Sequence, residues 1–317
     1  MRAKYLLVLS SCIIFLILSG CAKEKKSLDA ALKMQKFVID ISNYAHNIDS
    51  DFIIIPQNGI ELAFNNADAT NGINNNYLSA IDGFGVEELF YFGKYSPDDY
   101  RLKMLRELVA YKKILVSEFT SSSGFESDAL LKNYNEGFIC FVRNADNYYY
   151  TQIPSFVPNE NTNDIINLEQ AQNFLYIINS DNYASKQSFL NAVSSTNFDV
   201  ILMDLFYNEE QFSADDINML KSKANGAKRL VIAYMNIGSA ENFRYYWQSS
   251  WKLHKPKWIK RKYKGYDDEY WVEFWNSEWQ EIIFGNNNSY LYKIIRSGFD
   301  GAYLDNVEAY YSLFYRN

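Results

Sequence analysis

Short apolar segments alternate with helical patterns along most of the chain, and this alternation limits the possible folds more than any other feature. Apolar runs typical of buried strands occupy residues 52–55, 114–119, 138–142, 174–178, 200–203, 230–233 and 302–304, and a further strand is expected within 80–92. Helices are expected at 28–46, 97–112, 215–224 and 290–297. Such alternation is typical of an α/β fold with a parallel sheet. A count of roughly eight strands favours a single-domain (β/α)8 barrel of the TIM type over an open sheet.

Polar or acidic residues follow several of these strands directly. They are Gln57-Asn58, Glu87-Glu88, Glu118, Asp204 and Asp305-Asn306. In a parallel barrel the carboxyl ends of the strands share one face, and active sites are built there. Converging carboxylates suit glycoside hydrolysis, which needs an acid and a base or nucleophile on either side of the scissile bond. Any one of these acids could instead cap a helix or pair with a basic side chain.

Other chemistries find little support in the sequence. The chain has only two histidines, His46 and His254, and neither belongs to a recognisable motif, so a nucleophile triad lacks a base. No Cys/His cluster or phosphate-binding glycine loop is present, so we expect neither a metal nor a cofactor. The basic run from Lys252 to Lys264 could contact an anionic polymer or a lipid surface, but such runs are more often solvated loops.

The first residues resemble a bacterial lipoprotein signal rather than part of the fold. Arg2 and Lys4 precede a mostly apolar run, and Leu-Ser-Gly before Cys21 forms a lipobox. An ordinary secretory signal with an incidental cysteine is the alternative. We therefore expect residues 1–20 to be removed, Cys21 to carry lipid, and residues 21–27 to form a polar tether. The protein would be exported and anchored to a bacterial membrane, in the cell envelope or at the cell surface.

The formal charge of the chain indicates which polymers it could bind. It is −7, and loss of Arg2 and Lys4 with the signal would make it −9. This charge argues against a nucleic-acid partner and favours, weakly, a cationic polymer.

The second half of the chain contains four distinctive motifs. They are residues 198–205 (Phe-Asp-Val-Ile-Leu-Met-Asp-Leu), 233–247 (with Gly-Ser-Ala-Glu-Asn-Phe-Arg at 238–244), 271–275 (Trp-Val-Glu-Phe-Trp) and 298–307 (Gly-Phe-Asp-Gly-Ala-Tyr-Leu-Asp-Asn-Val). Together they resemble glycoside hydrolase family 114, the endo-α-1,4-polygalactosaminidase family. The similarity covers residues 174–310 in the family's own order. The second and fourth motifs together are fairly specific, whereas either alone would be weak.

The family's barrel normally continues beyond its Leu-Asp-Asn segment, but this chain stops at Asn317. The missing pieces resemble residues 28–144, which hold a helix, the turn at Gln57-Asn58-Gly59, the Glu87-Glu88 strand end and the Glu118 strand end. We therefore expect a circularly permuted barrel. Residues 28–144 would correspond to the family's C-terminal half and 174–317 to its N-terminal half, with 145–173 as a bridging segment. Two fused half-domains, or chance similarity of the first half, are the alternatives.

The resemblance implies roles for individual residues. Asp305 and Glu87 match the family's catalytic carboxylates, and the family's expected retention of configuration favours Glu87 as acid/base and Asp305 as nucleophile. Eight further residues would bind substrate or support the subsites: Gln57, Asn58, Glu118, Asp204, Tyr234, Glu241, Arg244 and Asn306. Ser239 stands where bacterial relatives often carry a glutamate.

Taken together, these features predict a lipid-anchored glycosidase that acts within an α-1,4-linked galactosamine-containing polysaccharide. A polysaccharide-binding surface lipoprotein with the same barrel but without turnover is the second hypothesis. A structural lipoprotein whose acids merely cap helices is the third.

Overall fold

The computed structural model describes residues 2–315, and the side chains of residues 23–315. Two parallel sheets form its centre, with strand orders β1-β13-β9-β6-β5 and β2-β3-β4. The parallel strands are β1 (Ile53–Pro56), β2 (Gly83–Tyr95), β3 (Lys113–Thr120), β4 (Ile139–Arg143), β5 (Phe174–Ile177), β6 (Val200–Met203), β9 (Leu230–Asn236) and β13 (Gly301–Asp305). Every strand expected from the sequence is therefore present, within a few residues of its expected limits.

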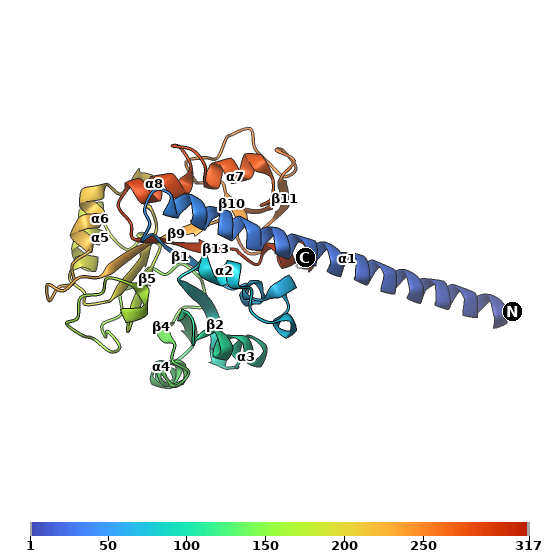
Figure 1. The fold of residues 1–317 in the computed structure, drawn as a ribbon, viewed down its shortest axis with the longest axis horizontal. Helices are drawn as coiled ribbons and strands as arrows, with labels where there is room; N and C mark the ends of the chain where they lie inside the picture. The colour runs from blue at the N-terminus through green and yellow to red at the C-terminus, as the bar shows by residue number, and fades with distance from the viewer. Residues whose placement is uncertain (1, 316–317) are drawn as a thin grey trace.

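The two sheets lie side by side in a barrel-like arrangement (Figure 1). Between β1 and β2, Gln57 forms an isolated parallel bridge with Gly85, and the Asp82 amide donates to the Ile54 carbonyl at 2.8 Å. β4 lies next to β5 without a hydrogen-bonded ladder. β13 pairs with β1 from Ile53 opposite Gly301, so the last strand of the chain lies beside the first.

Helices pack around the outside of the strands. They are α1 (Arg2–His46), α2 (Asn75–Ser79), α3 (Asp99–Leu108), α4 (Glu126–Asn135), α5 (Lys186–Ser194), α6 (Ala214–Leu220), α7 (Ser277–Ile283), α8 (Tyr290–Arg296) and α9 (Ala309–Tyr315). Several begin at a side-chain cap, which satisfies a free backbone amide of the first turn. Asp98, for example, accepts from the Arg101 amide at the start of α3, and Ser213 and Asp216 form a capping box at α6.

α1 lies along α9, the last helix of the chain (Figure 1). Met34, Phe37, Val38 and Ile41 are buried at helical spacing, as in an amphipathic helix that packs against a core. Residues 23–27, which we expected to form a tether, belong to this helix. The Ser27 hydroxyl is buried and donates to the Tyr310 carbonyl at 3.1 Å. The side chain of Cys21 lies outside the described part of the chain.

A smaller antiparallel sheet covers one end of the strands. It consists of β10 (Ser239–Glu241), β12 (Glu269–Val272) and β11 (Ile259–Lys262), and a short hairpin pairs β7 (Phe206–Tyr207) with β8 (Glu210–Gln211). The basic run from Lys252 to Lys264 contains β11 and is therefore not only a solvated loop. Within this run, Trp258 and Ile259 are buried. No helix whose side chains the structure describes is long and apolar enough to cross a membrane.

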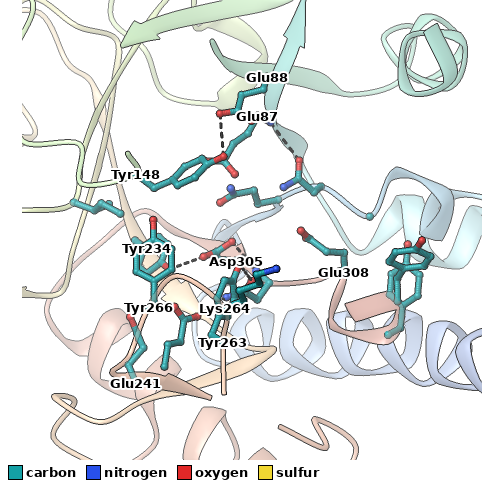
Figure 2. Close-up of a pocket in the computed structure, with 18 of the residues that line it drawn as sticks. Glu87, Glu88, Tyr148, Tyr234, Glu241, Tyr263, Lys264, Tyr266, Asp305 and Glu308 are labelled. Atoms are coloured by element: carbon teal, nitrogen blue, oxygen red, sulfur yellow. Dashed lines mark hydrogen bonds between the residues drawn. The ribbon is translucent and has the colours of Figure 1, made fainter. Parts of the chain in front are cut away.

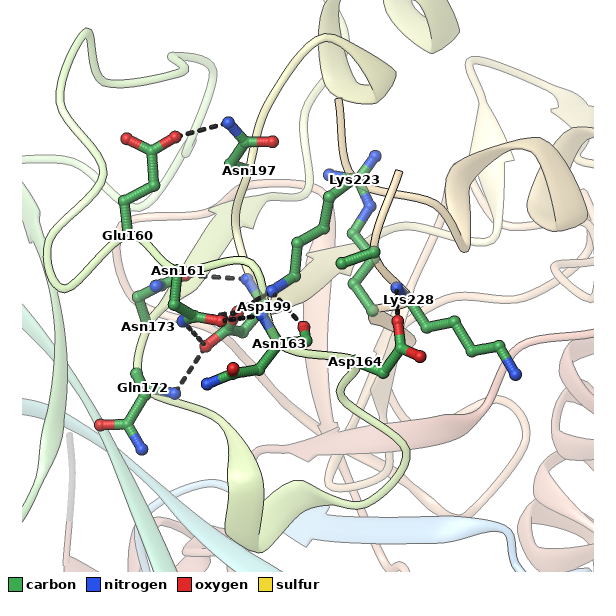
Figure 3. A network of polar contacts seen from close by, with 12 residues as sticks. Glu160, Asn161, Asn163, Asp164, Gln172, Asn173, Asn197, Asp199, Lys223 and Lys228 are labelled. Atoms are coloured by element: carbon green, nitrogen blue, oxygen red, sulfur yellow. Dashed lines mark hydrogen bonds and ion pairs between the residues drawn. The ribbon is translucent and has the colours of Figure 1, made fainter. Parts of the chain in front are cut away.

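The bridging segment, residues 145–173, has no strand and is held in place by a buried ion pair (Figure 3). Lys223 contacts Asp199 at 2.6 Å, and both side chains are completely buried. Asp199 also accepts hydrogen bonds from Asn161 and from the Gln172 amide, while Lys223 donates to the Asn163 carbonyl. The charges that anchor this segment are thus fully paired, as burial of an ion pair requires.

Candidate active site

One cavity of about 1280 Å³ lies over the carboxyl ends of the parallel strands. All the site residues predicted from the sequence line it except Glu118: Gln57, Asn58, Glu87, Asp204, Tyr234, Glu241, Arg244, Asp305 and Asn306. Glu87 and Asp305 approach the cavity from different strands and face each other across it (Figure 2). Carboxylates distant in the sequence are thereby brought together, as expected for a site built at parallel strand ends.

Glu87 lies where the regular part of β2 ends. Its ladder with β3 is regular up to Glu87 opposite Ser117 and then shifts register before Phe92. Glu88 adopts a positive φ of 55° at this irregularity. The guanidinium of Arg101 donates to the carbonyls of Glu87 and Glu88 at 2.8 and 2.7 Å, so the irregular backbone is fixed by a charged donor.

The Glu87 side chain is half-buried, and its carboxyl receives one hydrogen bond from a side chain. The Tyr150 hydroxyl, which also contacts Ser117, donates to Glu87 Oε1 at 2.7 Å. Burial raises the pKa of Glu87 to about 7, with a further contribution from the negative charge of Asp305. The hydrogen bond from Tyr150 opposes this rise because it stabilises the ionised form.

Asp305 ends β13 and receives two hydrogen bonds. Tyr234 donates to Oδ2 at 2.5 Å, and the backbone amide of Asn306 donates to Oδ1 at 2.6 Å. Burial raises the pKa of Asp305 to about 7, while the bond from Tyr234 lowers it. Two carboxyl groups with raised pKa values in one cavity fit proton transfer near neutral pH.

Two further acids at the cavity share one basic partner. Arg244 contacts Glu241 at 2.7 Å and Asp204 at 2.8 Å, and all three side chains are largely buried. Burial raises the pKa of Glu241, and the charge of Arg244 opposes the rise. This cluster forms a rigid polar wall, because each charge is held by a bidentate or paired contact.

Glu118 lies behind the cavity rather than in its lining. Its carboxylate accepts from the amides of Phe90 and Tyr91 and from Asn133, and the side chain is completely buried. We expected it to line or support a subsite. The structure places it as a support for β2 beyond Glu87, because the register shift leaves two strand amides free for a carboxylate to accept.

Several lining residues have no counterpart among the sequence predictions. Tyr148 and Tyr150 enter the cavity from the bridging segment, where the sequence has no regular pattern; only the run of three tyrosines at 148–150 could have indicated them. Tyr148 donates to Glu88, which also forms an ion pair with Arg143. Glu269, at the start of β12, also lines the cavity. Among the residues that the structure describes, no group of His, Cys, Asp and Glu side chains is arranged to hold a metal ion.

Comparisons with known proteins place these residues in a family. The profile described as Glycoside-hydrolase family GH114 matches residues 157–317. An uncharacterized protein of Methanocaldococcus jannaschii is 33% identical over 156 residues, which cover 45% of this chain and 42% of that protein. Uncharacterized proteins of Thermotoga maritima and Deinococcus radiodurans are 32% and 33% identical over 37% and 39% of this chain. The matches span 35% and 38% of those two relatives, so this chain covers less than half the length of each of the three.

The family match covers half of the chain and includes Asp204, Glu241, Arg244 and Asp305. The chain therefore belongs to glycoside-hydrolase family GH114.

Proposed function

We propose that this protein is an endo-acting glycoside hydrolase that cleaves a galactosamine-containing polysaccharide with Glu87 and Asp305. The observation that carries the proposal is the convergence of these two half-buried carboxyl groups in one cavity. Family membership supports the reaction class, because glycoside hydrolysis uses such a pair.

Within the pair we assign Glu87 as acid/base and Asp305 as nucleophile. Hydrogen bonds to a carboxylate favour its ionised form. Asp305 receives two, from Tyr234 and the Asn306 amide, whereas Glu87 receives one, from Tyr150. When the pair holds one proton, it therefore resides on Glu87. A protonated Glu87 can donate to the leaving oxygen while the ionised Asp305 attacks the anomeric carbon.

The cavity lining suggests a polymeric and cationic substrate. Exposed rings of Tyr149, Phe243 and Tyr311 line it and offer apolar faces to sugar rings. Glu87, Asp305 and several other lining acids have no lysine or arginine partner among the described residues; these others are Glu61, Asp268 and Glu269. An excess of unpaired carboxylates favours positively charged amino sugars over neutral or acidic ones.

We further propose that the strands form a closed (β/α)8 barrel in circularly permuted order. Three observations support this. β1 pairs with β13 in parallel, the bridge between Gln57 and Gly85 joins the two sheets, and the family match starts within the bridging segment and covers only the second half of the chain. A permutation is physically tolerable where the natural ends lie close together at the surface.

The membrane anchor is also part of the proposal. Lipid on Cys21 would attach the protein to a bacterial membrane, exported to the cell envelope or surface. It would hold the cavity near that membrane, because Glu24 of α1, three residues after Cys21, lines the cavity.

The proposal is tested by product release from defined polymers. The purified protein is incubated with de-N-acetylated α-1,4-galactosamine polymer, its fully N-acetylated form, and a neutral α-1,4-glucan. Internal cleavage predicts short oligosaccharides of mixed length from a galactosamine polymer and none from the glucan. Binding of the polymer without any products would instead favour the binding lipoprotein.

A further inference from the structure

Glu269 occupies a distinct position beside the proposed catalytic pair. It begins β12 and stands opposite Glu241 in the antiparallel pairing with β10. Its side chain lines the same cavity as Asp305 and Asn306. It therefore lies within reach of a sugar unit next to the scissile bond.

The two carboxyl oxygens of Glu269 differ in their hydrogen bonds to the protein. Oε1 accepts from the amides of Asn236 and Asn306, each at 3.0 Å, and from the Ser239 hydroxyl. No described group donates to Oε2. This oxygen is not one of the fully buried side-chain atoms that lack a hydrogen-bond partner. Oε2 is therefore open to the cavity, while the three donors to Oε1 fix the orientation of the carboxyl group.

The charge of Glu269 is not balanced by the protein. Among the described residues no lysine or arginine pairs with it, and its three donors are neutral. Burial, together with the charges of Glu241 and Asp305, raises the pKa of Glu269 to about 8. If only an acceptor for Ser239 and the two asparagines were needed, a neutral amide oxygen would serve without this repulsion. A positively charged ligand at Oε2 would relieve the repulsion and form a charge-assisted hydrogen bond.

We propose that Glu269 is a specificity-determining residue that binds the ammonium group of a de-N-acetylated sugar unit next to the scissile bond. This inference rests on the proposed function, because it assumes that an amino sugar occupies the cavity. An N-acetylated unit carries no positive charge on this nitrogen, and its acetyl group extends from the nitrogen into the space where the carboxylate would contact an ammonium group. Glu269 would therefore discriminate deacetylated from acetylated units of the same polymer.

The test measures binding in the absence of turnover. The full-length chain carrying Glu87→Gln is titrated with de-N-acetylated and N-acetylated α-1,4-galactosamine oligomers by isothermal calorimetry, with and without Glu269→Gln. Loss of a charge-assisted contact should weaken binding of the deacetylated oligomer about 10-fold or more, with binding of the acetylated oligomer nearly unchanged. The ratio of the two affinities within one variant does not depend on the fraction of folded protein.

Asp267→Asn is the matched control, since Asp267 is a fully exposed acid two residues before Glu269 that does not line the cavity. It should retain the preference for the deacetylated oligomer. An unchanged preference in Glu269→Gln, or an equal loss in Asp267→Asn, would overturn the role of Glu269 while leaving the proposed substrate intact. If the parent protein bound neither oligomer, the proposed substrate class would fail as well, so the two failures are distinguishable.

Discussion

The Tyr150 hydroxyl donates a 2.7 Å hydrogen bond to Glu87 across 63 positions of sequence. The Tyr150 ring stacks on that of Tyr176, with the ring centroids 3.8 Å apart, and the Tyr150 backbone has a positive φ of 45°. A non-glycine residue adopts this conformation only where its surroundings hold it there. The bridging segment is thus part of the candidate site as well as a connection between two halves.

Tyr150→Phe should change the pH dependence of activity. Loss of the hydroxyl removes a bond that favours ionised Glu87, so the pKa of Glu87 should rise above about 7. The limb of the kcat/KM profile that reports loss of the Glu87 proton should move to higher pH. Tyr149→Phe is the control, because Tyr149 is exposed. An unmoved limb with activity merely reduced would show that Tyr150 is only structural.

Gly238→Ala should damage both stability and activity. A Cβ at Gly238 would lie 2.0 Å from the Asn306 carbonyl oxygen and 2.7 Å from the Ala309 Cβ, so the backbone next to Asp305 would have to move. We expect a loss of about 1–3 kcal/mol in the free energy of unfolding, as for other overpacked sites, and a lower kcat. Gly124→Ala meets only the Ser122 hydroxyl at 3.6 Å and should change neither. Equal effects of the two substitutions in chemical denaturation would contradict this packing argument.

Breaking the buried Asp199–Lys223 pair should destabilise the fold strongly. Lys223→Met leaves Asp199 without its counter-charge at a fully buried position, and such losses are typically about 3–5 kcal/mol. The exposed pair of Lys36 and Asp40 offers a comparison, since Lys36→Met should cost no more than about 1 kcal/mol. Thermal unfolding of both variants measures the difference. Similar melting temperatures for the two would mean that the bridging segment does not depend on this pair.

Stability should decrease as the pH rises from about 5 to about 8. Glu87, Asp305 and Glu269 have folded-state pKa values of about 7, 7 and 8, above the ordinary values of such groups. The folded protein therefore binds more protons than the unfolded chain in this range, and the linkage relation makes stability fall with pH. Glu269→Gln removes one of these groups and should raise the melting temperature at pH 8 more than at pH 5. A melting temperature that increased with pH would contradict the burial of these acids.

The strands and most of the site could be predicted from the sequence because both depend on local patterns. Runs such as Ile53-Ile54-Ile55 identify buried strands, and the polar residues that follow parallel strands share one face. Three residues of the cavity could not be predicted from local patterns, because their positions depend on tertiary contacts: Tyr150, Arg101 and Glu269. Tyr150 lies in a segment without periodicity, Arg101 reaches back from α3 to two carbonyls, and Glu269 enters through the pairing of β12 with β10.

The position of Glu118 depends on a neighbouring strand. Glu118 lies within β3, and the register shift in β2 after Glu87 leaves two amides whose hydrogen bonds hold its carboxylate behind the cavity. A bulge of this kind depends on the neighbouring strand, so the position of Glu118 relative to the cavity could not be read from its own segment.

The most direct test of the account is hydrolysis of de-N-acetylated α-1,4-galactosamine polymer by the wild type, Asp305→Asn and Glu87→Gln. We expect the wild type to release short oligosaccharides and Glu87→Gln to lose roughly 10²–10⁴-fold in kcat, the range for a removed acid or base. Asp305→Asn should lose at least as much, because removal of a nucleophile abolishes the covalent step. Both variants should keep the melting temperature of the wild type within a few degrees, or exceed it. Each removes a carboxyl group whose ionised form is disfavoured in the folded protein. Wild-type hydrolysis that survived undiminished in both variants would show that Glu87 and Asp305 are not the catalytic pair.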